Sequence, residues 1–308
     1  MNKVRNFKVY LKVVFCNYLF FIVLTSCQNI QVKEKYILTT TQMLYDVVIN
    51  LVDSTFEVDF LMGEGTDPHL YKFSQIDLRK LNKAKVVINN GLHLEGKMNF
   101  IFQKISKNKI VVSVGDSLDK KYLISVSDKI HDPHIWFDIE LWKEVVKVVS
   151  SNLQKEFPKE KMKIQKKEKS YIQQLNNLQE FVRNEIEKIP PKQRVLITSH
   201  DAFRYFEKSW NFQVKALQGI STTAEYGLKD IQDLVDFISQ NNIKAVFVET
   251  SLPSKGLEAV MKGIESKGKK IKVIEGLYSD AMGAIGTFEG TYIGMYKSNV
   301  QKIVEALK

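Results

Sequence analysis

Short runs of β-branched and other apolar residues alternate with amphipathic stretches along most of the chain. Strands that alternate with helices form parallel sheets, because each crossover helix returns the chain to the same end of the sheet. The sequence therefore predicts an α/β fold with helices on both faces of mainly parallel sheets. Expected strands lie at 36–41, 55–62, 85–90, 110–114, 195–198, 213–217, 245–249 and 271–274, and expected helices lie at 42–52, 77–83, 139–157, 202–210, 228–240, 255–266 and 291–307.

One stretch, residues 158–189, interrupts this alternation. It starts at Pro158, is followed by Pro190-Pro191, and contains no glycine. Its apolar residues recur every three or four positions, which predicts one helix of about 30 residues, roughly 45 Å long. Two shorter helices would need a turn, for which Asn176-Asn177 is the only candidate. We expect a single long rigid backbone helix that joins two lobes, one at residues 36–157 and one at residues 190–308.

The N-terminal residues are typical of an export signal. Four basic residues precede a largely apolar stretch at 13–24, which is too short to span a bilayer as a helix. The segment Leu24-Thr25-Ser26-Cys27 resembles the lipobox of bacterial lipoproteins, whose cysteine is lipidated after cleavage. This resemblance implies a signal peptide at 1–26, a lipid on Cys27 and a polar tether at 27–35. A buried N-terminal helix is the alternative.

Cysteine content and charge exclude several classes of function. If Cys16 leaves with the signal and Cys27 carries lipid, the mature chain has no free thiol, which excludes disulfides and thiolate metal sites. Removal of the four basic signal residues lowers the net charge from +10 to +6. The remaining lysines, such as those at 155–169, lack interleaved arginines and aromatic residues. They fit solvated helix faces better than a nucleic-acid surface.

The tripeptide Asp-Pro-His occurs twice in a chain with only five histidines, at 67–69 and at 132–134. Proline fixes its own φ and favours an extended conformation in the preceding residue, so each tripeptide presents an imidazole from a stiff turn. A single copy would be read as a turn with an incidental histidine. Two copies favour His69 and His134 as metal ligands.

Two more candidate ligands follow predicted strands in the second half. His200 comes directly after the strand at 195–198, and Asp280 follows the strand that ends at 274. Ligands of α/β sheets gather beyond the carboxyl ends of the strands, where His69 and His134 also lie. Three imidazoles and one carboxylate suit zinc well and manganese or ferrous iron acceptably. Calcium and magnesium prefer oxygen ligands alone.

With these residues in view, the chain resembles the metal-binding solute receptors, cluster A-I, of bacterial ABC importers for zinc, manganese and iron. The resemblance covers nearly the whole mature chain and rests on residues 67–69, 132–138, 198–206, 278–283 and 286–295. It implies two α/β lobes joined by a rigid helix, with one metal in the cleft. It also implies ligands at His69, His134, His200 and Asp280, and partners in a membrane permease and its ATPase.

Other polar residues receive structural interpretations. We expect His93 and His131 to take no part in metal binding. Asp201 could orient the imidazole of His200, although capping a helix that begins at Ala202 is the favoured interpretation. The glycines between 283 and 294 lack the lysine and the strand context of a phosphate loop, so turns and close helix packing explain them better.

The resulting hypothesis is extracytoplasmic, high-affinity capture of a divalent transition metal and its delivery to an ABC permease. Zinc is favoured by the nitrogen-rich ligands, with manganese and Fe²⁺ as alternatives. Relatives that look manganese-dedicated tend to carry glutamate at the position of His200, which supports zinc. Against zinc, residues 115–129 lack the histidine-rich loop of many zinc-dedicated relatives, so the preference is modest and a receptor for both metals is an alternative.

The expected protein is a monomer that is lipid-anchored in the periplasm or at the cell surface. It is not an enzyme, because no nucleophile–base pair and no HExxH motif is present. A metal-dependent hydrolase and a metal-stabilised surface adhesin are the competing hypotheses. Affinity for the metal should fall as pH drops through the titration range of histidine.

Overall fold

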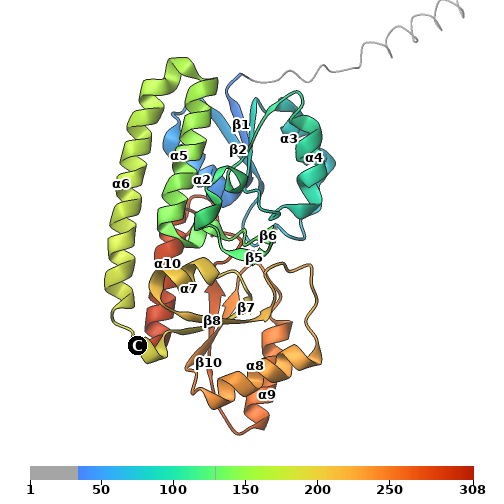
Figure 1. Cartoon of the computed structure of the whole chain (residues 1–308), viewed down its shortest axis with the longest axis vertical. Coiled ribbons are helices and arrows are strands. Elements are labelled where there is room, and N and C mark those ends of the chain that lie inside the picture. Colours follow the sequence, from blue (N-terminus) through green and yellow to red (C-terminus); the bar gives the residue numbers. More distant parts are fainter. Residues whose placement is uncertain (1–33, 129) are drawn as a thin grey trace, which may run out of the picture.

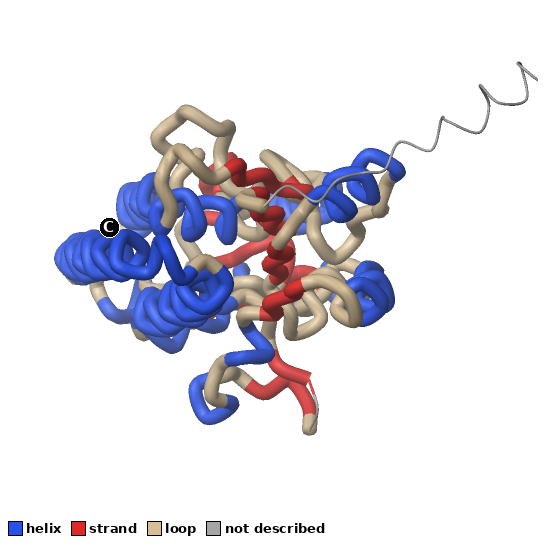
Figure 2. The backbone as a smooth tube through the Cα atoms, turned by 90° about the horizontal axis from the view of Figure 1, so that it is seen from above, coloured by secondary structure: helices blue, strands red, loops and turns tan. Residues whose placement is uncertain are grey.

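The computed structural model describes residues 34–128 and 130–308, so the proposed signal peptide, Cys27 and most of the tether lie outside the described residues. The chain folds into two α/β lobes, one above the other along the long axis of the molecule (Figure 1). Viewed along that axis, helices lie on both sides of the strands (Figure 2). These observations confirm the predicted fold class. No helix in the described part of the chain has the length and apolarity needed to span a membrane.

A four-stranded parallel sheet forms the first lobe, in the order β2-β1-β3-β4. One face packs against α3 and α4 through residues such as Leu38 and Leu81, and the other face packs against α2 and α5. The strands are β1 (Tyr36–Thr41), β2 (Glu57–Met62), β3 (Val86–Asn89) and β4 (Ile110–Ser113), and the helices are α2 (Gln42–Leu51), α3 (Gln75–Lys83), α4 (Asn99–Ile105) and α5 (Ile139–Glu156).

The second lobe contains two parallel strand pairs, β7 with β8 and β9 with β10, and β7 lies beside β9. Helices α8 and α9 cover one face through a cluster that includes Ile197 and Val246. The strands are β7 (Val195–His200), β8 (Gln213–Gln218), β9 (Ala245–Glu249) and β10 (Lys272–Leu277), and the helices are α7 (Arg204–Trp210), α8 (Leu228–Gln240), α9 (Lys255–Ser266) and α10 (Tyr292–Leu307).

Three local features differ from the sequence-based expectation. Helix α4 was not predicted, and neither was the short antiparallel hairpin of β5 (Ser125–Ser127) and β6 (Ile130–His131). Helix α7 begins at Arg204 rather than at Ala202, with Phe203 as its N-cap. The capping role expected for Asp201 is therefore wrong, because its Oδ2 instead accepts a hydrogen bond from Arg204 Nε at 2.7 Å.

The predicted long helix is one continuous element, α6 (Lys161–Ile186), which follows a 3-10 turn at Pro158–Glu160. Its 26 residues span about 39 Å, alongside both lobes (Figure 1). Asn176 and Asn177 lie inside the helix, where Asn176 Oδ1 accepts a hydrogen bond from Lys143 Nζ at 2.9 Å. The hairpin alternative is thereby excluded.

A continuous apolar core connects the lobes along α6 and α10. Trp142 is fully buried and stacks on Tyr292 with ring centroids 5.2 Å apart, as expected for a core residue. The hydroxyl of Tyr292 donates to the carbonyl of Trp136 at 2.7 Å, and that of Tyr296 donates to the carbonyl of Phe137 at 2.9 Å. These bonds tie the C-terminal helix to the segment that follows His134.

Close packing also explains the C-terminal glycines. A Cβ at Gly290 would collide with the carbonyl oxygen of Ala284, and one at Gly294 would collide with that of Phe288. The interpretation of these glycines as sites of close packing is confirmed.

Candidate metal centre

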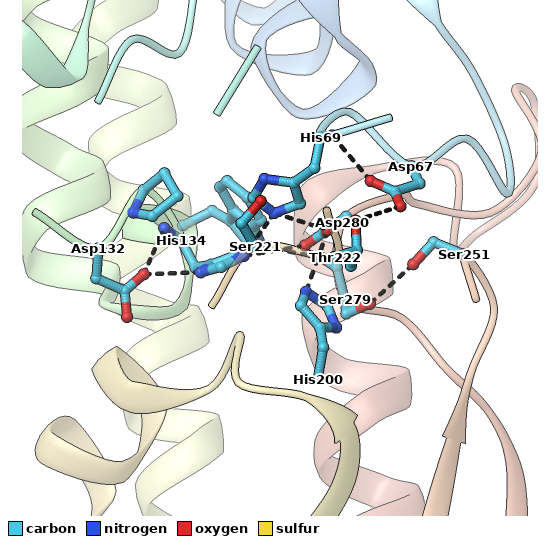
Figure 3. Close-up of polar contacts among 12 residues, drawn as sticks. Asp67, His69, Asp132, His134, His200, Ser221, Thr222, Ser251, Ser279 and Asp280 are labelled. Carbon is cyan, nitrogen blue, oxygen red and sulfur yellow. Dashed lines mark hydrogen bonds and ion pairs between the residues drawn. The ribbon is translucent and has the colours of Figure 1, made fainter. Parts of the chain in front are cut away.

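Four loops and strand ends bring the predicted ligands together between the lobes. His69 lies in the loop after β2, His134 lies between β6 and α5, His200 ends β7, and Asp280 follows β10. Their side chains point toward one another (Figure 3). One ligand atom from each residue lies within 4.8 Å of all the others, and each residue is at most 4% exposed.

The separations of the donor atoms suit a small cation. The Nε2 atoms of His69, His134 and His200 lie 3.5, 3.4 and 3.2 Å from oxygens of Asp280, and Nε2 of His69 is 3.4 Å from Nε2 of His134. A tetrahedral ion with bonds of about 2.0–2.1 Å places its ligands about 3.3 Å apart. Both oxygens of Asp280 face imidazoles, so the carboxylate can supply one or two ligand atoms.

Hydrogen bonding within the protein leaves this cluster unsatisfied. Both carboxylate oxygens of Asp280 and Nε2 of His200 are buried, and apart from the contacts within the cluster they have no hydrogen-bond partner among the described residues. Buried polar atoms without partners are costly and rare in folded proteins. A divalent cation coordinated by three imidazoles and one carboxylate would satisfy these atoms, so the residues present fit such a metal.

The two Asp-Pro-His tripeptides share a turn in which the aspartate fixes the histidine backbone. Asp67 Oδ1 accepts the backbone N–H of His69 at 2.8 Å, and Asp132 Oδ1 accepts that of His134 at 2.9 Å. This local bond, together with the restricted φ of proline, holds each imidazole in place. In both copies of the motif, the aspartate and the proline therefore hold the histidine in a fixed position.

Buried carboxylates orient two of the three imidazoles. Asp132 Oδ1 lies 2.7 Å from Nδ1 of His134, and Glu249 Oε2 lies 2.5 Å from Nδ1 of His200. Each carboxylate thereby favours a proton on Nδ1 and leaves Nε2 directed at the cluster. Sequence reasoning missed Glu249, although the signal was present, since an acidic residue ends the apolar strand that lies beside β7.

The electrostatics of the cluster follow from burial and close contact. Burial lowers the pKa of His69 to about 4, so this imidazole is neutral at physiological pH. Burial acts to raise the pKa of Asp280, but the neighbouring imidazoles hold that pKa below its usual range. For His200, burial acts to lower the pKa, whereas Glu249 and Asp280 raise it above its ordinary value.

The remaining histidines lie elsewhere. His93 is exposed, with φ of 65°, and its Nδ1 is 3.2 Å from Nδ2 of Asn99. His131 belongs to β6. Within residues 34–128 and 130–308, neither joins the group of side chains that could hold a metal.

Comparison with known proteins decides the family. The family model for the zinc-uptake complex component A, periplasmic (ZnuA), matches residues 37–306. The chain belongs to this family. ZnuA-family proteins are metal-binding solute receptors of ABC importers rather than enzymes, and the resemblance inferred from the motifs is thereby confirmed.

Individual ZnuA-family relatives agree with this assignment. The manganese-binding lipoprotein MntA of Bacillus subtilis is 45% identical over 277 residues, or 90% of each chain. The zinc-binding protein TroA of Treponema pallidum is 40% identical over 271 residues, or 88% of each chain. A structure of TroA covers 89% of this chain and 99% of its own at a TM-score of 0.87, with 39% identity. The structure of Fe(III)-bound YtgA from Chlamydia trachomatis covers 88% of this chain and 97% of its own, with a TM-score of 0.77 and 26% sequence identity.

Proposed function

We propose that this chain binds a divalent transition metal outside the cytoplasm and delivers it to the permease and ATPase of an ABC importer. The observation that carries this proposal is the buried cluster of His69, His134, His200 and Asp280, in which Nε2 of His200 and both carboxylate oxygens of Asp280 lack hydrogen-bond partners outside the cluster. In this proposal the three imidazoles donate nitrogen through Nε2, while Asp280 supplies negative charge and one or two oxygens.

The closed geometry supports binding without catalysis. A catalytic zinc site keeps an open position for water and substrate, whereas a site meant only to hold a metal is enclosed by protein ligands. All four donors here are buried, and two of the imidazoles are braced by carboxylates. We therefore propose that the chain has no enzymatic activity, which argues against the hydrolase alternative.

We propose zinc as the favoured cargo, with manganese and Fe²⁺ as alternatives. Three nitrogen donors and one carboxylate suit zinc, while manganese prefers a shell richer in oxygen. The relatives divide on this point, since MntA is named for manganese and TroA for zinc. Tighter binding of zinc by purified protein cannot decide the biological cargo, because most N/O sites prefer zinc to manganese.

We also propose a chain organisation in which residues 1–26 are removed, Cys27 carries lipid and 27–35 form a tether. Residues 36–157 and 190–308 then form the lobes, and 158–189 form the linking segment. The names of MntA and of other relatives as lipoproteins support the anchor. We also propose a monomer, because one continuous core already joins the two lobes of a single chain.

Metal uptake in cells tests the proposed function. Deletion of the gene should abolish most zinc uptake under zinc scarcity, and reintroduction of the wild-type gene should restore it. A gene carrying His200→Ala should fail to restore uptake at equal protein abundance. Normal uptake of zinc, manganese and iron in the deletion strain would contradict the receptor function. Loss of manganese uptake alone would reverse the preference for zinc.

A further inference from the structure

A hydrogen bond between two loops crosses the cleft beside the proposed metal site. The hydroxyl of Thr222, in the loop between β8 and α8, donates to Oδ2 of Asp67 at 2.6 Å (Figure 3). Asp67 lies in the loop between β2 and α3, which belongs to the other lobe. Neither side chain is among the four proposed ligands, so the bond has no assigned role in metal coordination.

Asp67 connects this bond directly to a ligand. Its second oxygen, Oδ1, accepts the backbone N–H of His69 at 2.8 Å. The two carboxylate oxygens belong to one rigid planar group, so a shift of Thr222 relative to Asp67 acts on the turn that presents His69. The carboxylate therefore couples the position of His69 to the loop of the opposite lobe.

The other end of the connection is also fixed. Gln218 ends β8, where it pairs in register with His200, and its Nε2 donates to the carbonyl of Thr222 at 2.9 Å. Thr222 is 7% exposed, so its hydroxyl is largely shielded from competing water. A chain of contacts thus runs from the strand beside His200, through Gln218, Thr222 and Asp67, to His69.

The three imidazoles differ in the hydrogen bonds that fix their rings. This difference makes the chain of contacts important for His69. Carboxylates accept hydrogen bonds from Nδ1 of His134 and Nδ1 of His200. Among the described residues, no carboxylate contacts Nδ1 of His69, whose ring meets a carboxylate only through Nε2 at Asp280, and this histidine lies in a loop. His69 is therefore the ligand most able to swing away, and its loop is restrained across the cleft by Thr222.

We propose that Asp67 and Thr222 form a latch that sets the rate at which the metal leaves. The latch positions the loop of His69 while it is closed, and its opening lets that ligand withdraw from the metal. In this proposal the latch opens for the metal to enter and closes over it, so it should act mainly on dissociation and leave association nearly unchanged. The inference rests on the proposed function and names two positioning residues for cargo release.

Zinc release from the purified mature chain tests the latch. The zinc-loaded protein is mixed rapidly with excess chelator, and the dissociation rate constant is compared with the association rate constant measured separately. Thr222→Val keeps the shape of the side chain and removes the donor, so release should accelerate about tenfold or more, since hydrogen bonds to charged groups are the stronger class. Association should change less than about twofold, on the expectation that interface changes act mainly on dissociation.

Three further variants separate the latch from general damage to the fold. Thr222→Ser retains the hydroxyl and should release zinc at close to the wild-type rate. Thr222→Ala should match Thr222→Val, which covers the case in which valine disturbs the loop. Thr223→Val removes a neighbouring exposed hydroxyl that contacts Ser221 and should have no effect. The absorption spectrum of the Co²⁺-loaded protein should be the same in all variants, because the ligands are unchanged.

The outcomes distinguish the latch from the receptor function. Wild-type release rates in both Thr222→Val and Thr222→Ala, with normal zinc binding by the wild-type chain, would overturn the latch alone. Failure of the wild-type chain to bind zinc would overturn the receptor function and the latch together. Equal acceleration by Thr223→Val would also overturn the latch, since it would show that the loop responds to any change.

Discussion

At the scale of single residues, the directions of the His134 and His200 imidazoles depend on carboxylates that are not among the proposed ligands. Glu249 accepts three hydrogen bonds, from the backbone N–H groups of Ser199 and His200 at 2.7 and 3.0 Å and from Nδ1 of His200. It thereby fixes both the end of β7 and the ring that β7 carries. A negative charge on Glu249 also strengthens the nitrogen donor of His200.

Replacement of this carboxylate by an amide should weaken zinc binding. Glu249→Gln keeps the volume of the side chain and removes its charge, so we expect a loss of about 10- to 100-fold in zinc affinity, the usual effect of losing such an outer partner. Competition titration with a zinc chelator measures this change. Glu258→Gln, at an exposed position in α9, is the matched control. An affinity of Glu249→Gln equal to that of the control would show that Glu249 does not support His200.

At the scale of secondary-structure elements, a buried polar contact joins α2 to α6. Tyr171, in the middle of α6, donates its hydroxyl to Oδ2 of Asp46 at 2.6 Å. Burial raises the pKa of Asp46 to about 6, and the hydrogen bond from Tyr171 only partly offsets this rise. The folded state therefore holds the proton of Asp46 more tightly than the unfolded chain does.

This shift predicts a pH dependence of stability. The contribution of Asp46 is fully present below about pH 4 and is lost as pH rises through about 6, at a cost of roughly 3 kcal/mol at neutral pH. Asp46→Asn cannot ionise and retains an acceptor for Tyr171. Its free energy of unfolding relative to wild type should therefore rise by roughly 3 kcal/mol between pH 4 and pH 7.5, as urea denaturation would show. A difference that stays constant across this range would mean that Asp46 is not protonated in the folded state.

The elements differ in how far the sequence predicts them. Helix α6 was predicted because a glycine-free apolar stripe between prolines has few alternatives. The hairpin of β5 and β6 was missed because Ser125, Val126 and Ser127 are all exposed, so its strands carry no apolar alternation. The start of α7 was misplaced because residues 201–203, which follow His200, are not helical, and Phe203 is the N-cap.

The same contrast applies to the site. The four candidate ligands could be predicted because each follows a strand or repeats a stiff turn. The roles of Glu249 and Thr222 could not be predicted, since they depend on β7 lying beside β9 and on two loops meeting across the cleft. Such pairings arise from the tertiary structure and leave no local pattern in the sequence.

At the scale of the whole molecule, the lobes are joined by more than a flexible linker. Helix α6 runs alongside both, and a continuous core extends from α5 through α10. The proposed ligands come from both lobes, two from each, so a metal ion held by them would bridge the lobes. With this ligand set, metal binding would be a property of the assembled chain rather than of either lobe.

Calorimetric titration of the metal-free chain with zinc tests this account most directly. We expect one ion per chain for the wild type, and His200→Ala and Asp280→Ala should each weaken binding at least about tenfold, or about 1.4 kcal/mol. His93→Ala and His131→Ala should leave affinity unchanged, because these imidazoles lie outside the cluster. Loss of affinity in His131→Ala together with wild-type affinity in His200→Ala would contradict the proposed site.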